Sequence, residues 1–128
     1  MPSRIILAGF SFGSAMAVRS VVNGLDCDDL LLIGLPLAWR PIPNPLADSG
    51  SRSVKTHIII GDRDEFCPVD HATAWHHKQQ QYGWARLSIV PDAGHFFHKR
   101  LPLLSATINE TLGDVSTTAQ RNTGVHSQ

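Results

Sequence analysis

Four short, mainly apolar runs alternate along the chain with segments whose apolar residues recur at helical spacing. The runs cover residues 4–8, 30–33, 56–60 and 85–90, and runs of this length and composition are typical of strands buried in a sheet. Strands that alternate with helices pair in parallel through right-handed crossovers. The pattern therefore predicts an α/β fold, with a parallel sheet of about four strands flanked by helices in three α/β/α layers.

Three helices are expected between and after these strands, over about residues 14–23, 69–82 and 99–112. Each shows one repeating face, formed in turn by Ala15, Val18 and Val22; by Ala72, Trp75, Gln79 and Tyr82; and by Leu101, Leu104, Ile108 and Leu112. The proline-rich segment 34–55 is expected to be irregular. We expect one domain over residues 1–112, followed by a disordered tail, 113–128, that is rich in Ser, Thr, Gln and Asn.

The first strand leads directly into Gly9-Phe10-Ser11-Phe12-Gly13, which matches the pattern Gly-x-Ser-x-Gly. Between a strand and a helix this pattern indicates a nucleophile elbow, in which a sharp turn holds the serine in a strained backbone conformation at the tip of the sheet. The turn crowds its neighbours, which small residues tolerate. Ser11 is therefore a candidate nucleophile.

Two later strands end in residues that complement a nucleophilic serine. Strand 56–60 is followed by Gly61-Asp62-Arg63-Asp64-Glu65, and strand 85–90 is followed by Pro91-Asp92-Ala93-Gly94-His95-Phe96-Phe97. Ser11, an acid and His95 thus occur in the chain order Ser, Asp, His. This order differs from the orders in the chymotrypsin and subtilisin families.

These three motifs in this order resemble the α/β-hydrolase superfamily, and in particular small bacterial hydrolases without a large lid domain. The resemblance implies that Ser11 is the nucleophile, His95 the general base and Asp64 the acid. Asp62 and Glu65 compete for the acid's role, and Asp64 is preferred because the family places the acid three residues after the glycine. The backbone N–H of Phe12 then corresponds to one oxyanion donor.

The implied activity is that of a serine hydrolase, specifically a carboxylesterase on small acyl esters, which needs no cofactor. The connection over residues 34–55 is too short for a folded lid, and nothing indicates a long lipid substrate. Phe10, Leu37 and Trp39 are candidate substrate-binding residues. Trp39 also fits a second interpretation, in which its ring merely covers the core.

The resemblance covers the C-terminal half of the fold, from the strand before the elbow onward, so the sequence predicts a truncated α/β-hydrolase fold. Strand 4–8 would then be an exposed apolar edge, and we expect a homodimer in which two such edges pair. The family's second oxyanion donor comes from a loop before this strand. The alternative function is therefore a catalytically weak or inactive hydrolase-like module that assembles with a partner chain.

Composition narrows the remaining classes. The formal net charge is +0 without a basic block, which argues against a nucleic-acid partner, and no apolar run approaches the length of a membrane span. The N-terminus lacks a signal-peptide pattern, so a cytoplasmic location is the default expectation. Cys27 and Cys67 are expected as reduced thiols. The seven histidines lack metal-ligand spacing, so no metal site is predicted.

Overall fold

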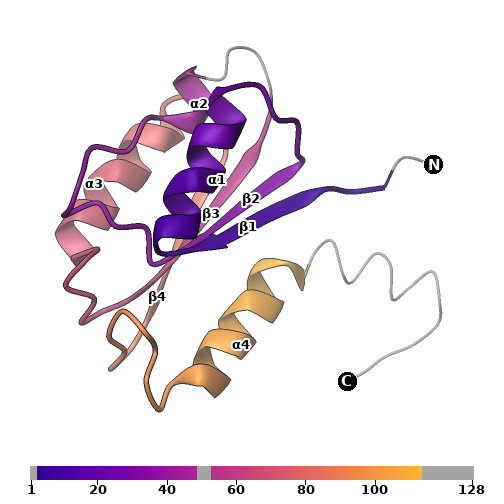
Figure 1. The fold of residues 1–128 in the computed structure, drawn as a ribbon. Helices are drawn as coiled ribbons and strands as arrows, with labels where there is room; N and C mark the ends of the chain where they lie inside the picture. Colours follow the sequence, from indigo (N-terminus) through magenta and orange to yellow (C-terminus); the bar gives the residue numbers. More distant parts are fainter. Residues whose placement is uncertain (1–2, 49–52, 114–128) are drawn as a thin grey trace, which may run out of the picture.

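The computed structural model describes residues 3–48 and 53–113, which form one parallel sheet with helices on both faces (Figure 1). The strands are β1 (Ile6–Phe10), β2 (Asp29–Ile33), β3 (Lys55–Gly61) and β4 (Ala85–Val90). The helices are α1 (Phe12–Val22), α2 (Pro45–Asp48), α3 (Val69–Gln80) and α4 (Leu101–Thr111). All pairings are parallel, and the strand order β1-β2-β3-β4 follows the chain. The predicted α/β fold with a four-stranded parallel sheet is confirmed.

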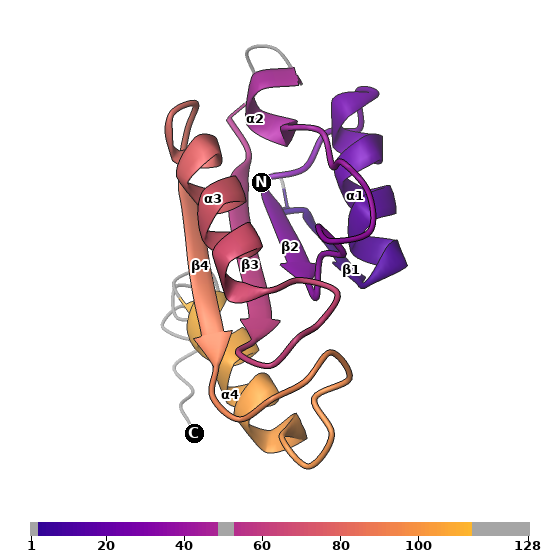
Figure 2. The same ribbon diagram turned by 90° about the vertical axis from the view of Figure 1, so that its left-hand side faces the viewer.

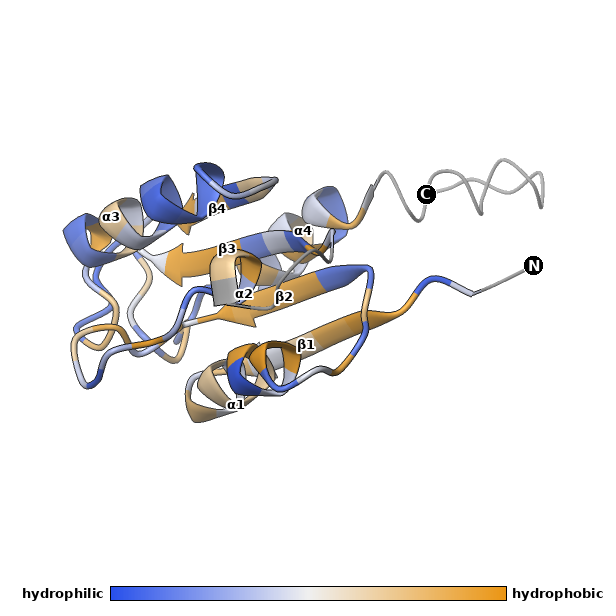
Figure 3. Cartoon of the chain, turned by 90° about the horizontal axis from the view of Figure 1, so that it is seen from above, coloured by the Kyte–Doolittle hydropathy of each residue, from blue (hydrophilic) through white to orange (hydrophobic). Residues whose placement is uncertain are grey.

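The helices form two layers around the sheet. Figures 1 and 2 show α1, α2 and α3 on one face and α4 on the other. Successive side chains of a strand point to opposite faces, so Leu30 and Leu32 of β2 pack toward Val18 and Val21 of α1, while Leu31 joins a second cluster beneath α4. Each fully buried aliphatic side chain stabilises the fold by roughly 1.5–3 kcal/mol. Figure 3 shows β1 and β2 coloured mainly as hydrophobic, whereas α3 is coloured mainly as hydrophilic.

The strand and the helix on either side of Ser11 have other bounds than the sequence predicts. The strand predicted over 4–8 lies at 6–10, and the helix predicted over 14–23 lies at 12–22. The strand continues up to the elbow because Ile33 of β2 still accepts a hydrogen bond from the backbone N–H of Ser11, at 2.8 Å. A single residue therefore separates β1 from α1.

Two helical faces are also less buried than their spacing predicts. Helix α3 ends at Gln80 rather than residue 82, so Tyr82 lies beyond the helix and is exposed, whereas Gln79 is buried. Helix α4 covers 101–111 rather than 99–112, and its first residue, Leu101, is 61% exposed. The segment expected to be irregular contains the single helical turn α2. Residues 114–128 of the predicted tail lie outside the described residues.

Strand β1 forms one edge of the sheet as far as the structure describes it. It pairs with β2 alone, so the backbone groups on its other side have no strand partner within residues 3–48 and 53–113. Ala8 is exposed on this strand, and Ile5, just before it, is 53% exposed. Unpaired apolar edges are surfaces on which another strand can add.

A hydrogen-bonded cluster around the buried carboxylate of Asp29 lies at the opposite end of the strands from Ser11. The carboxylate of Asp29 contacts His57 Nε2 at 2.9 Å and Arg4 Nε at 3.1 Å, which links β2, β3 and the segment before β1. Within the described residues, no helix is long and apolar enough to cross a bilayer.

Candidate active site

Ser11 occupies the turn between β1 and α1 in a backbone conformation that side chains rarely adopt. Its φ is 54° and its ψ is −120°, a strained combination for a residue other than glycine. The turn is held because Ser11 donates its N–H to Ile33 and accepts hydrogen bonds at its carbonyl from the backbone and the hydroxyl of Ser14. The half-buried Ser11 side chain therefore stands at the carboxyl end of β1, as a nucleophile elbow requires.

The two glycines of the motif differ in how much space surrounds them. A Cβ built on Gly9 would lie 2.3 Å from the carbonyl oxygen of Gly13, which no side chain tolerates. A Cβ on Gly13 meets nothing within 4 Å. The expectation that both flanking residues must be small therefore holds on steric grounds for Gly9 and fails for Gly13. The Cβ position of Gly9 faces the backbone of Gly13, whereas the Cβ position of Gly13 faces open space.

The pair Gly9→Ala and Gly13→Ala tests this asymmetry. We expect Gly9→Ala to lower the free energy of unfolding by roughly 1–3 kcal/mol or more, because the methyl group meets backbone that cannot move away. Gly13→Ala lies within α1 and should raise it by about 0.5–1 kcal/mol, since alanine is the better helix former. Urea unfolding measures both. Equal effects of the two substitutions would show that the turn is not packed as described.

Three side chains from distant parts of the chain form one hydrogen-bonded row at the carboxyl ends of the strands. His95 Nε2 lies 2.7 Å from Ser11 Oγ, and His95 Nδ1 lies 2.9 Å from Asp64 Oδ2. A carboxylate only accepts hydrogen bonds, so Nδ1 carries the proton and Nε2 of the neutral imidazole accepts from the serine hydroxyl. The structure thus brings together the serine, histidine and acid singled out in the sequence.

Asp64 is buried and its carboxylate is fully engaged. Oδ2 accepts from His95, while Oδ1 accepts from the backbone N–H groups of Phe66 at 2.8 Å and Cys67 at 2.9 Å. Such donors offset the cost of burying a charge. The competing acids are elsewhere: Asp62 and Glu65 are exposed, and Asp62 accepts a hydrogen bond from the backbone of Ala93. Geometry therefore favours Asp64 over both.

Three phenylalanine rings surround the imidazole of His95. The ring centroids of Phe66, Phe96 and Phe10 lie 4.4, 5.0 and 5.3 Å from that of His95. These contacts restrict rotation of the imidazole, which is itself buried. The sequence did not single out Phe66 as a residue of the site. Its position two residues after Asp64 was the signal that could have identified it.

Gly34 is a further residue of the site that the sequence analysis missed. Its φ is +64°, and a Cβ there would lie 3.1 Å from His95 Cε1 and 3.6 Å from Asp64 Oδ2. The backbone at the end of β2 therefore passes directly against the histidine and acid. A glycine immediately after an apolar strand was the signal in the sequence.

The predicted substrate-binding residues are in different surroundings. Phe10 is 42% exposed beside His95, and Trp39 is 70% exposed with its ring 4.8 Å from that of Phe66. Leu37 is partly buried and packs against two core clusters, and its role in substrate binding stays a prediction. The turn at residues 37–39 directs Leu37 inward and Trp39 outward, so Trp39 does not cover the core.

The thiol of Cys67 lies behind the acid. It is fully buried, and burial together with the negative charge of Asp64 raises the pKa of Cys67 from 9.0 to about 12. The thiol therefore stays protonated at neutral pH and is a poor nucleophile. The other cysteine of the described residues, Cys27, is partly exposed.

This pKa predicts a stability loss in alkaline solution. Below about pH 9 the thiol of Cys67 is protonated in both folded and unfolded chains, and its contribution is fully present; between about 9 and about 12 only the unfolded chain ionises, so stability falls. The stability difference between wild type and Cys67→Ala should therefore shrink by roughly 1 kcal/mol from pH 8 to pH 10. Urea unfolding at both pH values measures it. An unchanged difference would contradict the raised pKa.

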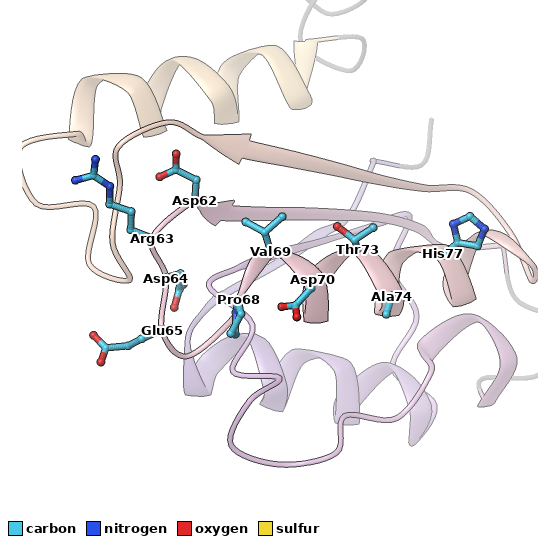
Figure 4. A pocket seen from close by; sticks show the side chains of 10 residues that line it. All are labelled: Asp62, Arg63, Asp64, Glu65, Pro68, Val69, Asp70, Thr73, Ala74 and His77. Carbon is cyan, nitrogen blue, oxygen red and sulfur yellow. The ribbon is translucent and has the colours of Figure 1, made fainter.

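A separate groove of about 960 Å³ runs along the outer face of α3 (Figure 4). It is lined by segment 62–65, by Pro68 and by residues of α3 as far as His77, and neither Ser11 nor His95 belongs to it. Asp64 is the one residue that this groove shares with the hydrogen-bonded row. Across residues 3–48 and 53–113, no three His, Cys, Asp or Glu side chains cluster as metal ligands would.

A parallel sheet with a strained serine between a strand and a helix, and with an acid and a histidine after two later strands, is the architecture of the α/β-hydrolase fold. Solved structures agree. The chain is similar to a lidless α/β serine hydrolase from Xanthomonas campestris, at 26% identity and a TM-score of 0.67, over 85% of this chain and 46% of that one. It is similar to an α/β serine hydrolase homologue from Coxiella burnetii, at 25% identity and a TM-score of 0.67, over 86% and 50%.

The same likeness extends to an esterase from Pyrococcus furiosus, at 18% identity and a TM-score of 0.68, over 87% of this chain and 54% of that one. The chain has the α/β-hydrolase fold and spans about half the length of these structures. Neither a protein-family model nor a curated protein sequence matches it.

Proposed function

We propose that this chain is a serine hydrolase in which Ser11 is the nucleophile, His95 the general base and Asp64 the orienting acid. The observation that carries the proposal is the continuous row of hydrogen bonds from Ser11 Oγ through the imidazole of His95 to Asp64. An adjacent general base makes a serine hydroxyl nucleophilic at neutral pH. The likeness to α/β serine hydrolases supports the same assignment.

The reaction has two steps. As Ser11 Oγ attacks the substrate carbonyl, His95 Nε2 removes the hydroxyl proton, and it then gives this proton to the leaving alcohol. An acyl group remains on Ser11. Water attacks the acyl group with His95 again as base, which releases the acid and restores the serine. Asp64 holds the proton on Nδ1 throughout and stabilises the imidazolium.

The negative charge on the substrate oxygen requires hydrogen-bond donors. Phe12 is the first residue of α1, so its backbone N–H has no partner inside the helix, and the positive end of the helix dipole lies at the same place. This N–H is the proposed oxyanion donor. In other acyl-transfer enzymes one such donor is worth about 2.7–4 kcal/mol, so the rate depends strongly on how many donors surround the oxygen.

The proposed substrates are esters of short acyl chains, which makes the chain a carboxylesterase. Support comes from the exposed rings of Phe10, Phe96 and Trp39 near His95, which offer apolar contact to a small acyl or alcohol group. The test compares nitrophenyl acetate and butyrate with nitrophenyl palmitate. We expect hydrolysis of the short esters with a higher kcat/KM; equal or better hydrolysis of palmitate would overturn the short-chain preference.

The free edge of β1 supports a second proposal, in which two copies of the chain pair through this strand in antiparallel fashion around Ala8. This homodimer would join the sheets of the two copies and cover both apolar edges. It also fits the alternative function, an assembly module with little activity of its own. Absence of turnover and of covalent labelling by a fluorophosphonate would favour that alternative.

The homodimer predicts a concentration-dependent mass. Size-exclusion chromatography with light scattering should give twice the chain mass at micromolar concentration. Ala8→Lys should shift the protein toward monomer, because it places like charges opposite each other across the two-fold axis. The matched control is Ala106→Lys, which places a lysine at an exposed position of α4, and this variant should remain dimeric. A wild-type protein that stays monomeric would eliminate this interface.

A further inference from the structure

The segment after β2 crosses the rim of the proposed active site and is held in place on the histidine side. Ala38 donates its backbone N–H to the carbonyl of Phe66 at 3.0 Å, and the ring of Trp39 lies 4.8 Å from that of Phe66. Phe66 in turn packs on His95. These contacts anchor residues 38 and 39 to the loop that carries Asp64 and Phe66. The residue that follows them, Arg40, therefore has a defined position.

That next residue, Arg40, reaches the nucleophile side. Its guanidinium carbon Cζ lies 5.8 Å from the ring centroid of Phe12, the residue directly after Ser11. A guanidinium over an aromatic ring is held by the ring's negative face, and this contact does not consume its N–H donors. Trp39 therefore contacts a ring that packs on His95, and Arg40 contacts the ring of the residue that follows Ser11.

The charge of Arg40 is not neutralised within the described part of the chain. No described carboxylate lies within ion-pair distance of its guanidinium, whereas Arg4, Arg63 and Arg86 each contact a carboxylate. The buried acid of the proposed active site, Asp64, already accepts hydrogen bonds from His95 and from two backbone N–H groups. Arg40 is thus an exposed cation whose guanidinium lies over the ring of Phe12, the residue whose backbone N–H is the proposed oxyanion donor.

We propose that Arg40 is a specificity-determining residue that selects substrates bearing a carboxylate, while Trp39 and Phe66 contact the apolar part of the same molecule. The inference rests on the proposed function of Ser11, because it assigns a substrate class to that site. A planar fork of N–H donors binds a carboxylate with two parallel hydrogen bonds, which a neutral amide of the same shape cannot accept as well.

Ligand binding tests this independently of turnover. Benzoate and benzamide are titrated into the wild-type protein and into the variants Arg40→Gln and Arg19→Gln. Binding is followed by tryptophan fluorescence, and the variant Trp39→Phe identifies the part of the signal that comes from Trp39. We expect wild type and Arg19→Gln to bind benzoate about threefold to fivefold more tightly than benzamide, as for an exposed ion pair, with a preference that weakens in high salt. Arg40→Gln should bind both ligands equally.

Each other outcome overturns the proposal. Equal affinities in wild type, or no detectable binding of either ligand, would show that Arg40 does not recognise a carboxylate. A benzoate preference that persists in Arg40→Gln would place the anion elsewhere, at the N-terminus of α1 for example. A different result would overturn the proposed hydrolase function, namely a Ser11 that does not react with a fluorophosphonate, so the two proposals can be told apart.

Discussion

Replacement of Ser11 by alanine is expected to remove nearly all of the ester hydrolysis that the chain catalyses. In serine hydrolases of other folds, loss of the nucleophile or of the base costs on the order of 10⁶ in kcat. Ser11→Ala and His95→Ala should therefore fall by similar amounts. The double variant should be no slower than either single one, since the two side chains act as one unit through their 2.7 Å hydrogen bond.

The control for this experiment is Ser105→Ala, which removes a hydroxyl from the exposed face of α4 and should keep wild-type rates. Initial rates on nitrophenyl acetate measure all variants, and circular dichroism verifies that each is folded. Residual hydrolysis by Ser11→Ala at more than about a tenth of the wild-type rate would mean that another group performs the reaction.

Replacement of Asp64 by asparagine is expected to lower kcat by about 10⁴, the loss measured for the same change in another serine hydrolase. An asparagine side chain occupies the same volume but can donate to Nδ1, which moves the imidazole proton to Nε2. The histidine then cannot accept the proton of Ser11, although the 2.9 Å contact between residues 64 and 95 is kept.

Asp62→Asn and Glu65→Gln are the matched controls, because both acids are exposed and lie on the same loop as Asp64 (Figure 4). Both variants should retain activity within about twofold, as expected for exposed side chains without a role in the reaction. A loss of similar size in Asp62→Asn would reassign the acid and contradict the geometry of the loop.

The order of elements could be predicted from the sequence because each depends on local patterns. The continuous apolar run of β2 and the helical spacing of Val18 in α1 identify their elements without reference to the rest of the fold. Element ends were less accurate. The strand before Ser11 was placed two residues too early, because its last hydrogen bond depends on Ile33, which belongs to another strand.

The hydrogen-bonded row was also within reach of sequence reasoning, because each of its members follows a strand of the same parallel sheet. The residues that position His95 were not. Gly34 and Phe66 lie against the imidazole only because the loops after β2 and β3 converge there, and such packing between distant segments leaves little trace in either local sequence. Leu37 is a further example, because its packing against two core clusters depends on distant segments and leaves no trace in the sequence around it.

The most direct test of the account is to identify which residue of the wild-type chain becomes covalently modified by a fluorophosphonate. Intact mass spectrometry and peptide mapping after incubation at neutral pH should show one adduct per chain, on Ser11, in the strained turn between β1 and α1. His95→Ala should react far more slowly, since the base that activates Ser11 is gone. An unmodified Ser11 in folded wild-type protein, or an adduct at another residue, would contradict the account.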